Sequence, residues 1–138
     1  MKKMSDLAYH YGLKMRIYPS SQQKKIIDLN GNIARTVYNK MVAIDQELYQ
    51  LKQIKLPIDS ILLRIEELKK RKQPSYLANH YRYLLNPLID SQAIANAKQN
   101  YQKAWKMFRQ VHRAGTPKFH KKGYRLSYQT NGHYRKDD

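Results

Sequence analysis

The chain has 138 residues, of which 27 are Lys or Arg and 10 are Asp or Glu, so its formal net charge is +17. This charge favours polyanionic partners such as nucleic acids and says nothing about the fold. Cysteine is absent, which excludes disulfides and thiolate metal sites. No apolar run approaches the ~20 residues that span a bilayer, and the basic start lacks the apolar segment of a signal peptide. We therefore expect a cytoplasmic basic protein without membrane contact.

An N-terminal strand is predicted over about 7–18. Apolar and polar side chains alternate from residue 9 to residue 17, which is the period of a half-buried strand. Pro19 ends this segment, and Ser20 and Ser21 are candidate caps for a short helix that begins near Gln22. The Asn-Gly-Asn stretch at 30–32 predicts a break before a second helix begins.

Three more helices are predicted in the middle of the chain. Apolar residues recur every three or four positions over 33–51, which indicates a long helix that ends near Gln53, before Pro57. The next helix begins at Pro57 and closes in the basic run 69–72. Cations are favoured there by the helix dipole, and nucleic-acid contact is the alternative interpretation. A shorter helix is predicted over 76–85.

The clearest helix pattern follows a candidate cap at Asp90 or Ser91. Apolar residues from Ile94 to Val111 alternate at three and four positions, which favours antiparallel packing at a shallow angle against 33–51. Gly115 supplies a stop signal. Alternation at 124–128 predicts a second strand that pairs with the first, supported by the helices.

The last third of the chain carries a one-signed charge pattern. Between residues 91 and 136 there are eleven basic residues and no acidic one. A solvated helix face normally mixes signs, because like charges four residues apart repel each other. The pattern therefore favours a polyanion-binding face over an ordinary solvated surface.

Three segments, in the right order over almost the whole chain, resemble the OrfB/TnpB family encoded by bacterial insertion sequences. They are KMRIYPSSQQ with NIARTVYNK, SQAIANAKQNYQKAWKMF, and GTPKFHKKGYRLSYQT. The family's members look like RNA-guided DNA nucleases, and its N-terminal part is described as a transposase helix-turn-helix domain. The first motif includes Arg35, Tyr38 and Asn39, for which packing or capping roles stay open beside nucleic-acid contact.

The expected fold is mainly α with a small β element, a helical bundle inserted between an N-terminal strand and a C-terminal strand. Residues 1–115 form the strand and the helical domain, with helices over about 21–113. Residues 116–138 form a basic tail that begins a truncated β domain.

The resemblance and the charge pattern together predict a nucleic-acid-binding module. Its partner is structured RNA, DNA or both, bound through phosphate contact and stacking. The predicted binding residues are Lys14, Arg16, Tyr18, Lys98, Lys106, Arg109, Arg113, Lys118, His120, Lys121, Lys122 and Arg125.

We expect no catalytic residue, metal or cofactor in this chain. The resemblance places the family's metal-dependent chemistry in a C-terminal RuvC-like nuclease domain, for which these 138 residues contain no counterpart. The five histidines show no ligand spacing, and the adjacent acids Glu66 and Glu67 lack an apolar setting. Two alternatives stay open: a remnant of a truncated element, and one half of a split nuclease with a separate partner.

Overall fold

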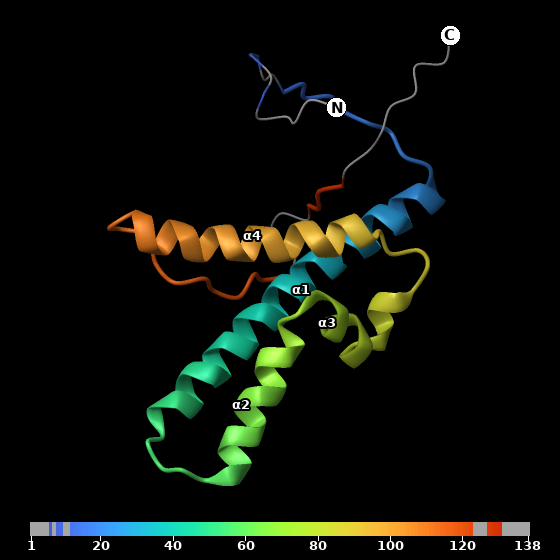
Figure 1. Ribbon diagram of the computed structural model, residues 1–138. Helices are drawn as coiled ribbons and strands as arrows, with labels where there is room; N and C mark the ends of the chain where they lie inside the picture. The colour runs from blue at the N-terminus through green and yellow to red at the C-terminus, as the bar shows by residue number, and fades with distance from the viewer. Residues whose placement is uncertain (1–5, 7, 10–11, 123–126, 131–138) are drawn as a thin grey trace.

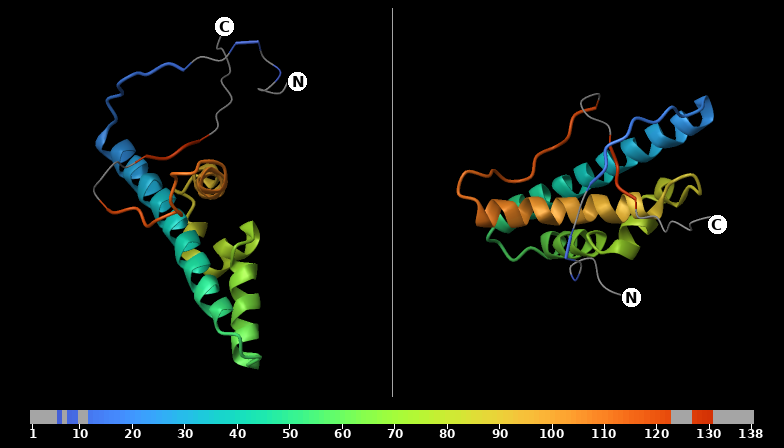
Figure 2. Two further views of the ribbon diagram at one scale, coloured as in Figure 1. Left: turned by 90° about the vertical axis from the view of Figure 1, so that its left-hand side faces the viewer. Right: turned by 90° about the horizontal axis from the view of Figure 1, so that it is seen from above.

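The computed structural model describes residues 6, 8–9, 12–122 and 127–130 (Figure 1). Its elements are α1 (Ser21–Gln53), α2 (Asp59–Arg71), α3 (Pro74–His80), the 3-10 helix η2 (Arg82–Leu85) and α4 (Ser91–Gln110). Helices α2, α3 and α4 lie on the same side of α1 (Figure 2). The molecule is therefore organised around α1.

Helix α1 is one unbroken helix of 33 residues. It begins with a capping box, in which Gln23 N donates to Ser20 Oγ and Ser20 N donates to Gln23 Oε1. The predicted break at 30–32 is wrong, because Asn30 is buried and uses its amide to hold another part of the chain. Its Nδ2 donates to Leu88 O at 3.3 Å, and its Oδ1 accepts from Asp90 N at 2.7 Å.

The predicted end of α1 at Gln53 is confirmed. Helix α2 returns antiparallel to α1 and is tied to it by Arg64, whose guanidinium donates to both carboxylate oxygens of Glu47 at 2.7 and 3.1 Å. The helix predicted over 76–85 is divided into α3 and η2, because Tyr81 leaves the helical conformation with φ −106° and ψ 81°.

Helix α4 begins at the predicted cap, since the Asp90 side chain accepts a hydrogen bond from Gln92 N. It packs against α1 as expected, but the two helices cross while running in the same sense (Figures 1 and 2). Asn30 of α1 holds the start of α4, and Asp45, further along α1, bonds the hydroxyl of Tyr101. The antiparallel arrangement predicted from the spacing is therefore wrong.

The core lies between α1 and the helices beside it. Val37, Leu68, Leu77 and Ala93 are at most 1% exposed. Fully burying a large aliphatic side chain contributes about 1.5–3 kcal/mol. The small Ala93 lets α4 approach α1 closely, and the rings of Tyr38 and Tyr101 meet edge to face with centroids 5.5 Å apart.

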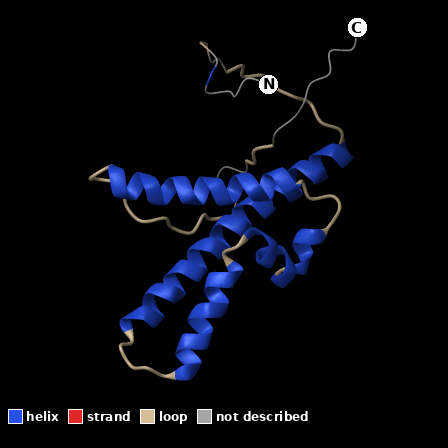
Figure 3. Cartoon of the chain, viewed as in Figure 1, coloured by secondary structure: helices blue, strands red, loops and turns tan. Residues whose placement is uncertain are grey.

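Neither predicted strand is present among the described residues (Figure 3). Leu13, Met15 and Ile17 expose 76%, 73% and 68% of their surface. A strand forms when its backbone groups pair with a neighbour, and no described segment offers such an edge. The second predicted strand lies partly outside the described residues, and 127–128 are not in a strand. The described fold is therefore a helical bundle, and the expectation of flanking strands is wrong.

Candidate nucleic-acid interface

The basic segment after α4 turns back and docks on α1. Asn39 Nδ2 donates to His120 O at 3.0 Å, and His120 N donates to Asn39 Oδ1 at 2.7 Å. The imidazole of His120 stacks on the ring of Tyr38, with centroids 4.0 Å apart and planes 13° apart. A single pair of neighbouring helix residues thus fixes both the backbone and the side chain of His120.

A second attachment joins residues 127–130 to α4. Asn96 Nδ2 donates to Gln129 O at 2.9 Å, and Asn100 Nδ2 donates to Gln129 Oε1 at 3.2 Å. Sequence reasoning missed Asn96 and Asn100, because neutral amides on a helix leave no charge or hydropathy pattern. Asn39 and Tyr38 were visible as motif residues, and the structure gives them packing and docking roles.

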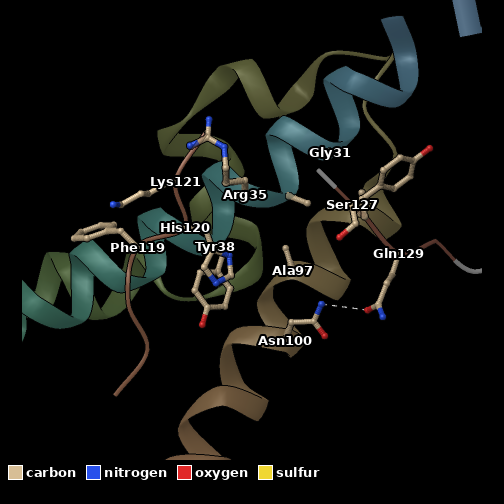
Figure 4. Close-up of a pocket in the computed structure, with 13 residues that line it drawn as sticks. Gly31, Arg35, Tyr38, Ala97, Asn100, Phe119, His120, Lys121, Ser127 and Gln129 are labelled. Atoms are coloured by element: carbon tan, nitrogen blue, oxygen red, sulfur yellow. Dashed lines mark hydrogen bonds between the residues drawn. The ribbon is translucent and has the colours of Figure 1, made fainter. Parts of the chain in front are cut away.

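Between α1, α4 and residues 119–121 and 127–129 lies a cavity of about 650 Å³, which we call the tail pocket (Figure 4). Its lining includes four small residues of the two helices: Gly31, Ala34, Ala93 and Ala97. Arg35 and Lys121 add two cations, and the Asn100–Gln129 hydrogen bond lies along another wall. Arg35 Nε is buried and makes no hydrogen bond within the described part of the chain.

Six of the predicted binding residues are exposed on the second half of α4 or on the segment after it. They are Lys106, Arg109, Arg113, Lys118, Lys121 and Lys122. His120 is exposed as well, but its ring and backbone are engaged by Tyr38 and Asn39. Arg125 lies outside the described residues.

Lys98 does not belong to this exposed surface. It is 9% exposed, and burial lowers the pKa of its ammonium group. Helix α4 buries Ala93 and Lys98 as well as Ala97 and Tyr101. Its buried face is therefore broader than the apolar stripe predicted from the spacing. The prediction that Lys98 shares an exposed basic face is therefore wrong.

The N-terminal candidates lie on residues 12–19, which lead away from the start of α1 (Figure 1). Lys14, Arg16 and Tyr18 are all exposed. The guanidinium carbon of Arg16 stands 5.4 Å from the ring centroid of Tyr18, a cation–π contact.

Charge is divided unevenly over the molecule. The described ion pairs join α1 to α2 and its C-terminal cap or lie within α2: Glu47–Arg64, Glu67–Arg64, Glu67–Arg71 and Asp45–Lys72. Among the described residues, the cations from Lys103 to Lys122 make no ion pair. Their mutual repulsion is therefore left for an external anion to relieve.

The described residues contain no group of three or more histidines and carboxylates placed to hold a metal ion. Among the same residues, no helix is both long and apolar enough to cross a membrane.

Residues 9–53 match the model of a helix-turn-helix domain of OrfB proteins from IS605-type elements. The match covers the N-terminal third of the chain, confirms the resemblance there, and identifies that third as an OrfB-type helix-turn-helix domain. Such a domain indicates nucleic-acid binding in a transposon-associated protein. No curated protein and no solved structure matches the chain.

The matched residues have an unexpected geometry for a domain of that description. Their described part comprises the N-terminal segment and α1, without a turn between two helices. A helix-turn-helix reads DNA by placing its second helix in the major groove. The structure therefore has no second helix after a turn within residues 12–53 that could serve as such a recognition helix.

Proposed function

We propose that this chain is the nucleic-acid-binding module of an OrfB-like transposon protein. It binds guide-type RNA, DNA or both through phosphates, which lie along the second half of α4 and the docked segment 111–122. It has no nuclease activity of its own.

The observation that carries this proposal is the exposed, unpaired charge from Lys103 to Lys122. A cation that neutralises a phosphate releases condensed counterions, which supplies most sequence-independent affinity. The acidic side chains that form ion pairs among the described residues lie instead on α1 and α2. An anionic strand therefore meets positive charge there that no ion pair among the described residues neutralises.

The docking of the segment also supports binding. Asn39 and Tyr38 hold His120 in place, so Lys118, Lys121 and Lys122 flank a fixed point. Ordering a loop before it binds lowers the entropic cost of association. Phe119, 50% exposed, adds a ring of the kind on which RNA bases stack.

The test compares two triple variants with the same change in charge. Replacing Lys118, Lys121 and Lys122 with Ala removes the segment's cations. Replacing Lys24, Lys25 and Lys55 with Ala removes three exposed cations elsewhere. The ligands are the transposon's own end-derived RNA, a random RNA and duplex DNA of equal length, measured by fluorescence anisotropy.

The first variant is expected to bind on the order of a hundredfold more weakly near 0.1 M salt, because three phosphate contacts are lost. The control variant should change affinity far less. Equal weakening by both would contradict the assigned face, and preference for the end-derived RNA would support the guide-RNA part of the proposal.

A purified sample with Mg²⁺ should cut none of the three ligands; specific metal-dependent cleavage would overturn the non-enzymatic part.

A second candidate, half of a split nuclease, is favoured by the N-terminal segment. Leu13, Met15 and Ile17 are an alternating apolar row that no described segment covers. A separately translated nuclease half that pairs with this row would bury it. Met15→Asp should then reduce co-purification of the two halves, and unchanged co-purification would argue against pairing at this row.

A further inference from the structure

A second cavity, of about 800 Å³, opens between α1, α2 and α4, and we call it the interhelical groove. It meets a different face of α4 from the tail pocket, because Gln102, Trp105 and Arg109 line the groove while Ala93, Ala97 and Asn100 line the pocket. The groove was not predicted from the sequence, since it gathers residues from three separate helices.

Cations from all sides of the groove converge on it. Lys52 comes from the end of α1, Lys69 from the last turn of α2, Lys72 from just after α2, and Arg109 from the end of α4. One carboxylate lines the same space, that of Asp45, and it is already engaged. Lys72 Nζ lies 2.6 Å from Asp45 Oδ1, and the Tyr101 hydroxyl donates to Asp45 Oδ2.

The remaining cations are uncompensated. Lys52, Lys69 and Arg109 make no ion pair with any described residue. The groove is therefore lined by three positive charges from three helices that have no ion-pair partner among the described residues, which matches a ligand with spaced negative charges better than a single small anion.

Aromatic rings accompany these charges. Tyr49 is 68% exposed, and Trp105 lines the groove half-buried, supported by an edge-to-face contact with Phe108. Cations that follow a phosphate backbone, together with rings on which bases stack, characterise single-strand binding sites. A duplex hides its base faces, so the exposed ring of Tyr49 and the half-buried ring of Trp105 favour an unpaired strand.

We propose that the interhelical groove binds a single-stranded stretch of nucleic acid. Its phosphates contact Lys52, Lys69 and Arg109, and its bases stack on Tyr49 and Trp105. This inference rests on the proposed function and adds a second, strand-selective site to it.

The groove contains its own reporter, because Trp105 is the single tryptophan of the chain. Titration with a twelve-nucleotide oligouridine or oligothymidine should quench its fluorescence saturably. A duplex of the same length should bind by anisotropy without the same quenching. An oligoglutamate of equal charge tests whether any polyanion suffices.

Two neighbouring lysines supply a matched control. Lys69 lines the groove, whereas Lys70, exposed on the same turn of α2, does not. Lys69→Ala should weaken oligouridine binding about fivefold at 0.1 M salt and flatten the salt slope by about 0.7, as expected for one lost single-strand phosphate contact. Lys70→Ala should leave both unchanged. Tyr49→Ala should weaken binding about tenfold, and Tyr76→Ala on α3 should not.

The outcomes separate this inference from the proposed function. Oligouridine binding by anisotropy, without Trp105 quenching and with equal Lys69 and Lys70 variants, overturns the groove site alone. Equal quenching by oligoglutamate also overturns it, because the groove would then accept any polyanion. The absence of binding to every nucleic acid at low salt overturns the proposed function as well. Circular dichroism of each variant confirms that the fold is retained.

Discussion

At the scale of single residues, Asn39 of α1 holds the docked segment 111–122 against that helix. Its amide makes two hydrogen bonds to the backbone of His120. Each such bond contributes about 0.5–1.5 kcal/mol. In the Asn39→Ala variant, the docked segment should therefore detach from α1 more readily. Trypsin should then cleave after Lys118, Lys121 and Lys122 about tenfold faster than in the unchanged protein. Asn79→Ala, at an exposed position of α3, is the control. Equal cleavage rates of the two variants would show that the Asn39 hydrogen bonds do not hold the segment on α1.

Tyr101 makes a pH-dependent contribution to stability. Burial, and then the hydrogen bond to Asp45, raise the pKa of its phenol well above the usual 10.0. The folded state therefore favours the neutral phenol. Its stabilisation is complete below about pH 10, where the unfolded phenol keeps its proton, and it is lost as the pH rises further.

The Tyr101→Phe variant tests this linkage. At pH 7 it should be about 2 kcal/mol less stable, because a hydrogen bond to a charged carboxylate is lost. Its further loss of stability between pH 9 and pH 11 should be smaller than that of the unchanged protein. Lys98, Tyr38 and Tyr83 also have shifted pKa values, but both proteins contain them, so the comparison isolates Tyr101. Parallel stability curves from urea unfolding would contradict the assignment.

At the scale of the elements, Asn30 is the junction between α1 and the start of α4. Asn30→Ala should destabilise the protein by about 1–3 kcal/mol, because the Asp90 N–H and the Leu88 carbonyl lose the buried Asn30 amide as their partner. Asn32→Ala is the matched control two residues away, and it should change stability by no more than a few tenths of a kcal/mol. Urea unfolding midpoints measure both, and equal values would mean that the junction contributes little.

Helix α4 offers a second matched pair, which tests whether the buried Lys98 contributes to binding. Lys106 is exposed and Lys98 is buried on the same helix. Lys106→Gln should reduce the salt slope of RNA binding by about 0.7–0.9, as one phosphate contact is lost. Lys98→Gln should leave that slope unchanged in the protein that remains folded. A reduced slope for Lys98→Gln would show that the buried lysine becomes exposed on binding.

At the scale of the whole molecule, the sequence predicts a feature correctly when residues close to it in the chain determine that feature. The Asp90 cap and the end of α1 at Gln53 follow from neighbouring residues, and both are confirmed. The amide of Asn30 bonds Leu88 and Asp90, far along the chain, so local turn rules misread it as a break.

The strands and the site show the same difference between features set by neighbouring residues and features set by contacts distant in the sequence. Alternation over 9–17 indicates a strand only if another segment pairs with it, and pairing is not encoded locally. The exposure of Lys106, Arg113 and Lys118 agrees with a surface site, whereas the burial of Lys98 depends on how broadly α4 packs. The interhelical groove is not predictable from the sequence, because it forms only from the relative positions of α1, α2 and α4.

The salt dependence of RNA binding by the unchanged protein tests the central claim most directly. If six cations between Lys103 and Lys122 engage phosphates, log K should fall with log salt at a slope of about −4 for single strands and about −5 for duplex. The affinity should then drop by on the order of a thousandfold between 50 and 200 mM salt. Binding that is insensitive to salt, or absent at low salt, would contradict the claim that this protein holds nucleic acid by its phosphates.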